Sequence, residues 1–101
     1  MSKQDISFSP ISPRQAVALR LSDTLLALGL DDAYGINVAK ATDKKGVQHW
    51  SITFCRARTV DGLIRVYSPK YILITFQQSQ RQAQRFTSLV AAQVWLAQEF
   101  A

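Results

Sequence analysis

Basic and aromatic side chains gather in the middle of this chain, and their combination is one that binds nucleic acid. Arginine and lysine attract phosphates, and aromatic rings stack on bases at roughly 1–3 kcal/mol each. The residues expected to make such contacts are Lys40, Lys44, Lys45, Arg56, Arg58, Arg65, Tyr67, Lys70 and Tyr71. We therefore expect a nucleic-acid-binding surface that prefers single-stranded DNA or RNA.

Catalysis is not expected, because the candidate nucleophile and base lie too far apart. Cys55 and His49 are the only cysteine and the only histidine of the chain. Six residues apart on one strand, they are separated by about 20 Å, which excludes a hydrogen-bonded pair. A buried thiol is the favoured interpretation of Cys55. The chain also lacks a glycine-rich phosphate loop and a set of metal ligands. We expect a non-enzymatic protein without a cofactor.

Charge is distributed unevenly along the chain. The net charge is +5, and residues 36–98 contain nine bases and two acids, whereas residues 1–35 contain three bases and four acids. A basic segment of this kind suits a polyanionic partner. The alternative is a solvated basic surface that only maintains solubility.

The chain has 101 residues, which is the size of one domain. Residues 1–11 show no hydrophobic period and are expected to form a flexible arm ahead of a domain over residues 12–101. No apolar stretch approaches the roughly 20 residues of a membrane span, and the first residues lack the apolar region of a signal peptide. With one cysteine, a cytoplasmic location without a membrane partner is the expectation.

A helix is expected to begin sharply near residue 12. Ser12 can cap it, Pro13 suits the first helical position, and Gln15 lies at the capping-box distance from the serine. Gly29 is placed to end the helix in a left-handed conformation. The apolar stripe of this helix comprises Val17, Leu21, Leu25 and Leu28, widened by Leu19, Leu26 and Leu30.

Four strands of a curved antiparallel sheet should follow, which makes the fold class α+β. They span Tyr34–Ala41, Gln48–Thr59, Leu63–Phe76 and Gln82–Phe86. Asp43 to Gly46 should form a tight turn, and Pro69 marks a bulge, an edge or a break, because proline cannot donate to a ladder.

A second helix should begin at Thr87 or Ser88, and a longer helix from residue 80 is the alternative. Its apolar face comprises Leu89, Ala92, Val94 or Trp95, Leu96 and Phe100.

The Asp61-Gly62 pair is the strongest hairpin signal in the chain. A turn there opposes Val60 with Leu63, Arg58 with Arg65, and Arg56 with Tyr67. Period-two alternation then places the arginines on the face of Trp50 and Phe54, as in a stacking platform. A bulge near residue 55 would instead bury Trp50 and Phe54 and turn the arginines toward water.

A basic aromatic sheet followed by a helix, over residues 34–100, resembles the single-stranded DNA-binding fold of the Whirly proteins and of the positive-cofactor-four type coactivators. The resemblance implies a four-stranded antiparallel sheet, binding of single-stranded DNA and a homodimer formed through the helices. It rests on topology and charge, so it assigns no role to an individual residue.

Two other resemblances and one other function compete with this interpretation. The order of one helix, three strands and a second helix is similar to that of the double-stranded RNA-binding domain, in which lysines begin the last helix. In this chain the cations nearest to that position are Arg81 and Arg85. A helix followed by a curved sheet also resembles cystatin-like folds, which imply no function. The alternative function is an assembly module that dimerises through the C-terminal helix, because Glu99 is the only charged residue after Arg85.

Overall fold

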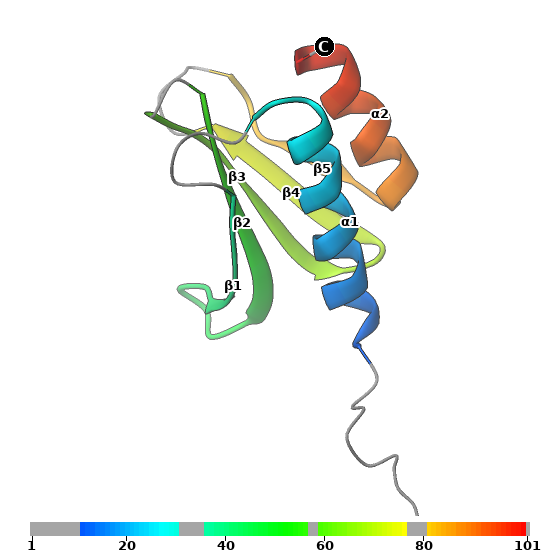
Figure 1. Ribbon diagram of the computed structural model, residues 1–101. Coiled ribbons are helices and arrows are strands. Elements are labelled where there is room, and N and C mark those ends of the chain that lie inside the picture. Colours follow the sequence, from blue (N-terminus) through cyan, green and yellow to red (C-terminus); the bar gives the residue numbers. More distant parts are fainter. Residues whose placement is uncertain (1–10, 31–35, 57–58, 77–80, 101) are drawn as a thin grey trace, which may run out of the picture.

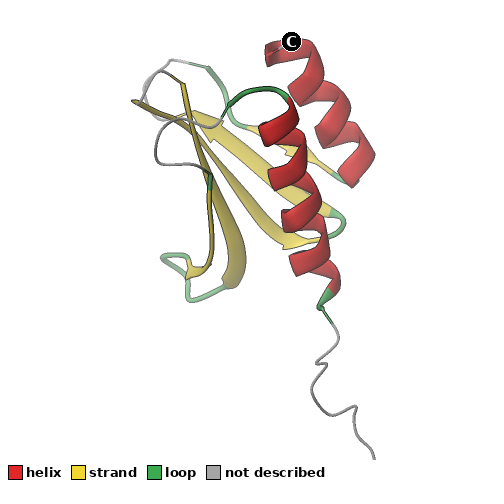
Figure 2. Cartoon of the chain, viewed as in Figure 1, coloured by secondary structure: helices red, strands yellow, loops and turns green. Residues whose placement is uncertain are grey.

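The chain forms two layers, a five-stranded sheet and a pair of helices that cover one of its faces (Figures 1 and 2). This arrangement comes from a computed structural model that describes residues 11–30, 36–56, 59–76 and 81–100; for residues 55, 56 and 59–61 it describes the backbone alone. The elements are α1 (Pro13–Ala27), β1 (Asn37–Thr42), β2 (Gln48–Arg56), β3 (Thr59–Ser68), β4 (Tyr71–Phe76), β5 (Gln84–Phe86) and α2 (Leu89–Phe100). The expected arm over residues 1–11 lies outside the described residues, apart from Ile11.

Each strand pairs with the next strand of the chain, in the order β1-β2-β3-β4-β5, and every pair is antiparallel. The α+β class is confirmed, but the expected four strands are five. The chain turns at Pro69 and Lys70, so that the segment expected as one strand becomes β3 and β4. Of the three possibilities at Pro69, the break is correct.

Local signals set both ends of α1 as expected. The Ser12 hydroxyl accepts a hydrogen bond from the Gln15 amide at 3.2 Å, and Pro13 occupies the first turn of α1. Gly29 has a φ of +71°, and the next amide, that of Leu30, donates back to the Leu25 carbonyl at 3.0 Å. This is the six-to-one bond of a glycine-terminated helix.

The start of α2 agrees with the expected strand-then-helix arrangement. The Ser88 hydroxyl accepts a hydrogen bond from the Ala91 amide at 3.1 Å, which is the geometry of an N-cap. Residues 84–86 form β5, so the alternative of a helix from residue 80 is wrong.

The core lies between the helices and the sheet and is built from one face of each element. Its sheet side comprises Ile52, Phe54, Ile64, Val66, Ile72 and Ile74, and its helix side comprises Val17, Ala18, Leu21, Leu25, Ala92, Leu96 and Phe100. The apolar stripe of α1 is narrower than expected, because Leu19 and Leu26 are 42% and 49% exposed.

The expected pairing of β2 with β3 is wrong. Arg65 pairs with Ser51, not with Arg58, and Arg56 pairs with Thr59, so the connection falls at residues 57–58 and Gly62 lies within β3. A register shift separates Phe54 from the next residue of β2. Arg58 and the side chain of Arg56 lie outside the described residues.

Packing against Phe54 explains why Gly62 is in a strand. Gly62 pairs with Phe54, and a Cβ atom added to Gly62 would lie 2.2 Å from Cζ of that ring. Phe54 is fully buried, and its ring meets those of Phe76 and Phe100 edge-on. The Asp-Gly signal therefore marks a close approach in the core, and not a turn. The interpretation of Phe54 as a core residue is confirmed, and Trp50 packs against the core, partly buried.

Candidate nucleic-acid interface

The face of the sheet opposite the helices is open, and it carries the residues left over from the core. Both helices lie on one side of the sheet (Figure 2). Side chains alternate along β3 and β4, so that the residues next to the buried isoleucines along each strand point outward. One outward row crosses four strands through the paired residues Ser51, Arg65, Leu73 and Arg85. The open face therefore presents cations from two strands that are not neighbours.

A depression of about 540 Å³ lies beside this row, where the β1–β2 turn approaches the ends of β3 and β4. Its lining consists of Thr42, Asp43, Lys44, Lys45, Arg65, Tyr67 and Tyr71. Three of these seven residues are cations and two are aromatic. Such a mixture can hold a phosphate at the rim and a base on a ring.

Aromatic rings form a continuous line along the depression. The ring centroids of His49 and Tyr67 are 4.8 Å apart, and those of Tyr67 and Tyr71 are 5.2 Å apart. The Arg85 guanidinium lies over Tyr71 at 5.7 Å, within the range of a cation–π contact. His49 is buried, whereas Tyr71 is 42% exposed. Tyr71 is therefore the ring of this line that solvent reaches most readily.

Asp43 is the one acid among the described residues of the depression, and it organises the turn. Its Oδ1 accepts hydrogen bonds from the amides of Lys45 and Val47, both at 2.9 Å. Its Oδ2 accepts one from the Tyr67 hydroxyl at 3.2 Å. Gly46, with a φ of +84°, closes the turn as expected. These bonds hold the Lys44-Lys45 pair against the end of β3.

The same contacts displace two pKa values in opposite directions. The hydrogen bond from the Val47 amide lowers the pKa of Asp43 below its ordinary value of 3.8 and outweighs burial, which raises this pKa. The Lys45 amide and the Tyr67 hydroxyl lower the pKa of Asp43 further, each by less than burial raises it. Burial and the bond to the Asp43 carboxylate raise the pKa of Tyr67 above its ordinary value of 10.0. Tyr67 is thus held as a neutral donor, and Asp43 as an anion.

The structure brings together five of the nine residues expected at the interface. Lys44, Lys45, Arg65, Tyr67 and Tyr71 line one depression.

Of the other expected residues, Lys40 and Lys70 do not join this cluster, and Arg58 and the side chain of Arg56 lie outside the described residues. Lys40 lies on the helix side of the sheet, where it pairs with Trp50. Lys70 is exposed in the β3–β4 turn and does not line the depression. Of the two interpretations of Trp50 and Phe54, the core is confirmed and the stacking platform is wrong, since Phe54 lies in the core and Trp50 packs against it.

Sequence reasoning missed His49, Asp43 and Arg85. Arg85 could have been found once β4 and β5 were separated, because Leu73 lies between it and Arg65 in the ladder. His49 was considered only as a base. Its Nδ1 lies 3.3 Å from the Val47 carbonyl and its ring stacks on Tyr67, so it supports the turn.

The described parts of the chain contain no group of three or more histidines, cysteines, aspartates or glutamates arranged to hold a metal ion. The side chain of Cys55 lies outside those parts. Neither α1 nor α2 has the length and apolar character that a membrane-crossing helix needs.

Comparison of the chain with protein-family models, curated proteins and solved structures returns no match. The resemblance to Whirly proteins and related coactivators therefore stays a prediction. Any function has to be argued from the residues of the open face themselves.

Proposed function

We propose that this protein is a non-enzymatic module that binds single-stranded nucleic acid on the open face of its sheet. The observation that carries the proposal is the cluster of Lys44, Lys45 and Arg65 around Tyr67 and Tyr71. These cations come from the β1–β2 turn and from β3, on a face that the helices leave uncovered.

Each part of the cluster has a separate task in this proposal. The exposed Tyr71 ring stacks on a base, and Arg85 extends the charged surface beyond it. Lys44 and Lys45 at the turn hold backbone phosphates. A single strand is favoured because its bases are free to stack on an exposed ring of the open face. The bases of a duplex are already stacked on one another.

Fluorescence anisotropy with labelled single-stranded oligonucleotides of about 15 nucleotides tests the proposal. Tyr71→Ala should weaken binding roughly 5- to 100-fold, which corresponds to the loss of one stacked base. Arg65→Gln should weaken binding and reduce the dependence of log K on log salt by about 0.7. Arg20→Gln removes the same charge from an exposed position on α1 and should leave the affinity unchanged.

Three results would contradict this proposal. They are an absence of binding at tens of micromolar protein in low salt, binding that does not weaken between about 50 and 200 mM salt, and equal losses for Arg65→Gln and Arg20→Gln. If the protein binds a duplex of the same sequence more tightly than the single strand, the ligand is double-stranded nucleic acid.

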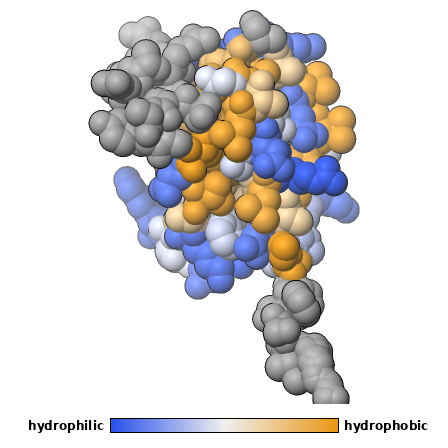
Figure 3. All heavy atoms as spheres, viewed as in Figure 1, coloured by the Kyte–Doolittle hydropathy of each residue, from blue (hydrophilic) through white to orange (hydrophobic). Residues whose placement is uncertain are grey.

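A second candidate function is assembly into a homodimer through the helices. We propose it because exposed apolar side chains occur on both helices: Leu19 (42%), Leu26 (49%), Val90 (66%) and Val94 (50%). In the space-filling view, apolar and polar surface alternate over this layer (Figure 3). Sedimentation equilibrium should detect a dimer that Val94→Gln weakens. A monomer at every protein concentration would contradict the assembly proposal and leave the first proposal standing.

A further inference from the structure

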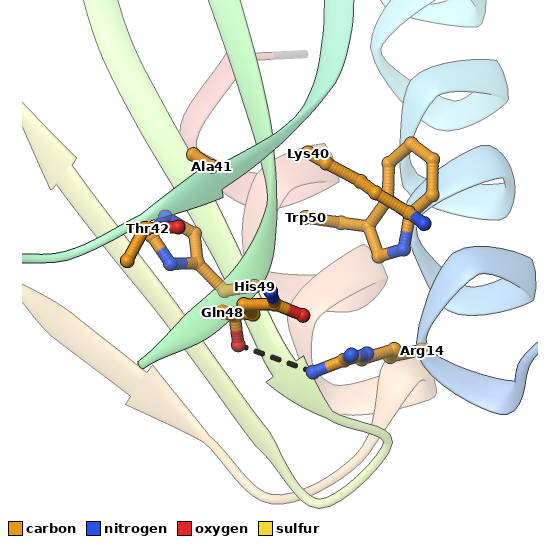
Figure 4. A pocket seen from close by; sticks show the side chains of 7 residues that line it. All are labelled: Arg14, Lys40, Ala41, Thr42, Gln48, His49 and Trp50. Carbon is orange, nitrogen blue, oxygen red and sulfur yellow. Dashed lines mark hydrogen bonds between the residues drawn. The ribbon is translucent and has the colours of Figure 1, made fainter. Parts of the chain in front are cut away.

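A small hollow lies on the helix side of the sheet, between the first turn of α1 and the strands β1 and β2 (Figure 4). Arg14, Lys40, Gln48 and Trp50 contribute to its lining, and its volume is about 100 Å³. Pockets for drug-sized ligands occupy roughly 300–1,000 Å³, so this hollow suits only a small group. None of these four residues lines the depression on the open face.

Hydrogen-bond donors from three elements surround the hollow. Arg14 of α1 gives one N–H to the Gln48 carbonyl at 3.1 Å, and this bond leaves further guanidinium donors available. The Lys40 ammonium of β1 lies 5.8 Å from the ring centroid of Trp50. In Figure 4, Lys40 extends along the indole of Trp50, and the guanidinium of Arg14 lies across the hollow from them.

Anionic acceptors that would match these donors are missing from the described lining of the hollow. No aspartate or glutamate lines the hollow, and the first turn of α1 contains no acid. Arg14 and Lys40 form no ion pair within the described residues, where the one such pair joins Arg81 to Glu99. The indole N–H of Trp50, a partly buried residue, has no hydrogen-bond partner there either. A buried or half-buried donor usually finds a partner.

We propose that this hollow binds a tetrahedral oxyanion, namely phosphate or the phosphate group of a monoester. Two cations, of which Lys40 is exposed and Arg14 is half-buried, and a neutral N–H suit a multiply charged anion, because charge-assisted hydrogen bonds are stronger than neutral ones. The donors approach from three elements, α1, β1 and β2. The four tetrahedral oxygens of a phosphate match them better than the two coplanar oxygens of a carboxylate do. The hollow shares Thr42 with the lining of the depression, but its donors Arg14, Lys40 and Trp50 lie outside the proposed nucleic-acid interface.

The two tryptophans of the chain allow a direct test by two-dimensional NMR of the indole N–H groups. Trp95 packs against Phe76 and Phe86, with ring centroids 5.8 and 5.7 Å away, and it serves as an internal reference. Inorganic phosphate, added against sodium chloride of equal ionic strength, should shift the Trp50 signal along a saturating curve. The Trp95 signal should not move. Trp95→Phe assigns the two signals.

Matched variants connect the shift to the hollow. Lys40→Gln and Arg14→Gln should each weaken phosphate binding about tenfold or more, as expected for a hydrogen bond to a charged group. Arg20→Gln removes the same charge on α1 outside the hollow and should retain the wild-type affinity. Because Arg14 also anchors Gln48, Lys40→Gln is the variant that tests binding if Arg14→Gln disturbs the fold.

Acetate and a nucleoside 5′-monophosphate complete the experiment. The monophosphate should bind at least as tightly as inorganic phosphate, and tighter binding identifies a monoester as the ligand. Three results would overturn the proposal: a Trp50 shift that does not saturate at tens of millimolar phosphate, equal shifts of both indoles, or acetate binding as tightly as phosphate. Equal weakening by Arg20→Gln and Lys40→Gln would also do so.

Discussion

Gly62 shows how one residue without a side chain fixes the packing of the core. The Phe54 ring occupies the space in which any Cβ atom at position 62 would lie. Phe54 itself is enclosed by Phe76 and Phe100, so the ring cannot move aside without disturbing two further aromatic residues. Close packing of this kind converts a change of one methyl group into strain.

Gly62→Ala should therefore destabilise the protein by about 1–3 kcal/mol, the usual range for overpacking a core. Urea unfolding followed by circular dichroism measures this change. Replacing the ring as well, in Gly62→Ala with Phe54→Leu, should restore part of the loss relative to the sum of the single variants. If Gly62→Ala alone is as stable as the wild type, the Phe54 ring can move aside without cost.

Asp43 makes stability depend on pH at the acid end. Its folded-state pKa is lowered, so an unfolded chain binds a proton at this carboxyl at a higher pH than the folded chain does. The contribution of Asp43 is complete above the ordinary pKa of 3.8 and is lost as the pH falls through the lower folded-state value. We expect the free energy of unfolding to decrease in this range, measured by urea unfolding at a series of pH values.

Two variants separate this effect from general acid unfolding. Asp43→Asn cannot titrate and should flatten the pH dependence, and the asparagine can still cap the turn through its side-chain oxygen. Tyr67→Phe removes one of the three hydrogen bonds to the carboxylate and should flatten it only in part. An unchanged slope in Asp43→Asn would assign the acid sensitivity to other carboxyl groups.

At the scale of elements, α2 depends on a single side-chain cap. The Ser88 hydroxyl accepts a hydrogen bond from the Ala91 amide. The first turn of α2 contains no acidic side chain that could also stabilise the N-terminus of the helix. Ser88→Ala should lower the free energy of unfolding by about 1 kcal/mol, and Ser88→Asn should restore most of it. Thermal unfolding of the three proteins provides the measurement. A loss that asparagine does not restore would mean that the cap is not the cause.

Helix ends and the β1–β2 turn were predictable because their causes are local. Ser12, Gly29 and Gly46 act on residues within one turn of the chain, and each is found in its expected role. The Asp61-Gly62 signal failed because a distant contact, with Phe54, outweighs the local preference. A prediction made from short segments of sequence cannot detect the contact between Phe54 and Gly62.

The binding surface was predicted in part for a similar reason. Tyr67 and Tyr71 are brought together by the β3–β4 turn that Pro69 marks. The face of Trp50 stayed open between a stacking platform and the core, because alternation along a strand separates two faces but does not say which one the helices cover. Only the positions of α1 and α2 on the sheet decide this.

At the scale of the whole molecule, the open face and the helix layer are on opposite sides of the sheet, so their properties should separate. Val94→Gln should change self-association and leave the affinity for a short single-stranded oligonucleotide unchanged. Sedimentation equilibrium and anisotropy on the same samples measure both quantities. A parallel change in the two would show that a dimer contributes directly to the binding surface.

The uninterrupted order of the strands also has a consequence for how the chain folds. Every strand pairs with the one made just before it, so the sheet requires only short loop closures, which favour rapid folding. The two helices instead meet across a long separation in sequence, because Gln93 of α2 donates a hydrogen bond to Thr24 of α1, 69 residues away. We expect hairpins to form from the middle of the chain, with α1 docking onto them and α2 closing the aromatic core last. The segment that precedes the sheet in the chain is then ordered only after the sheet itself.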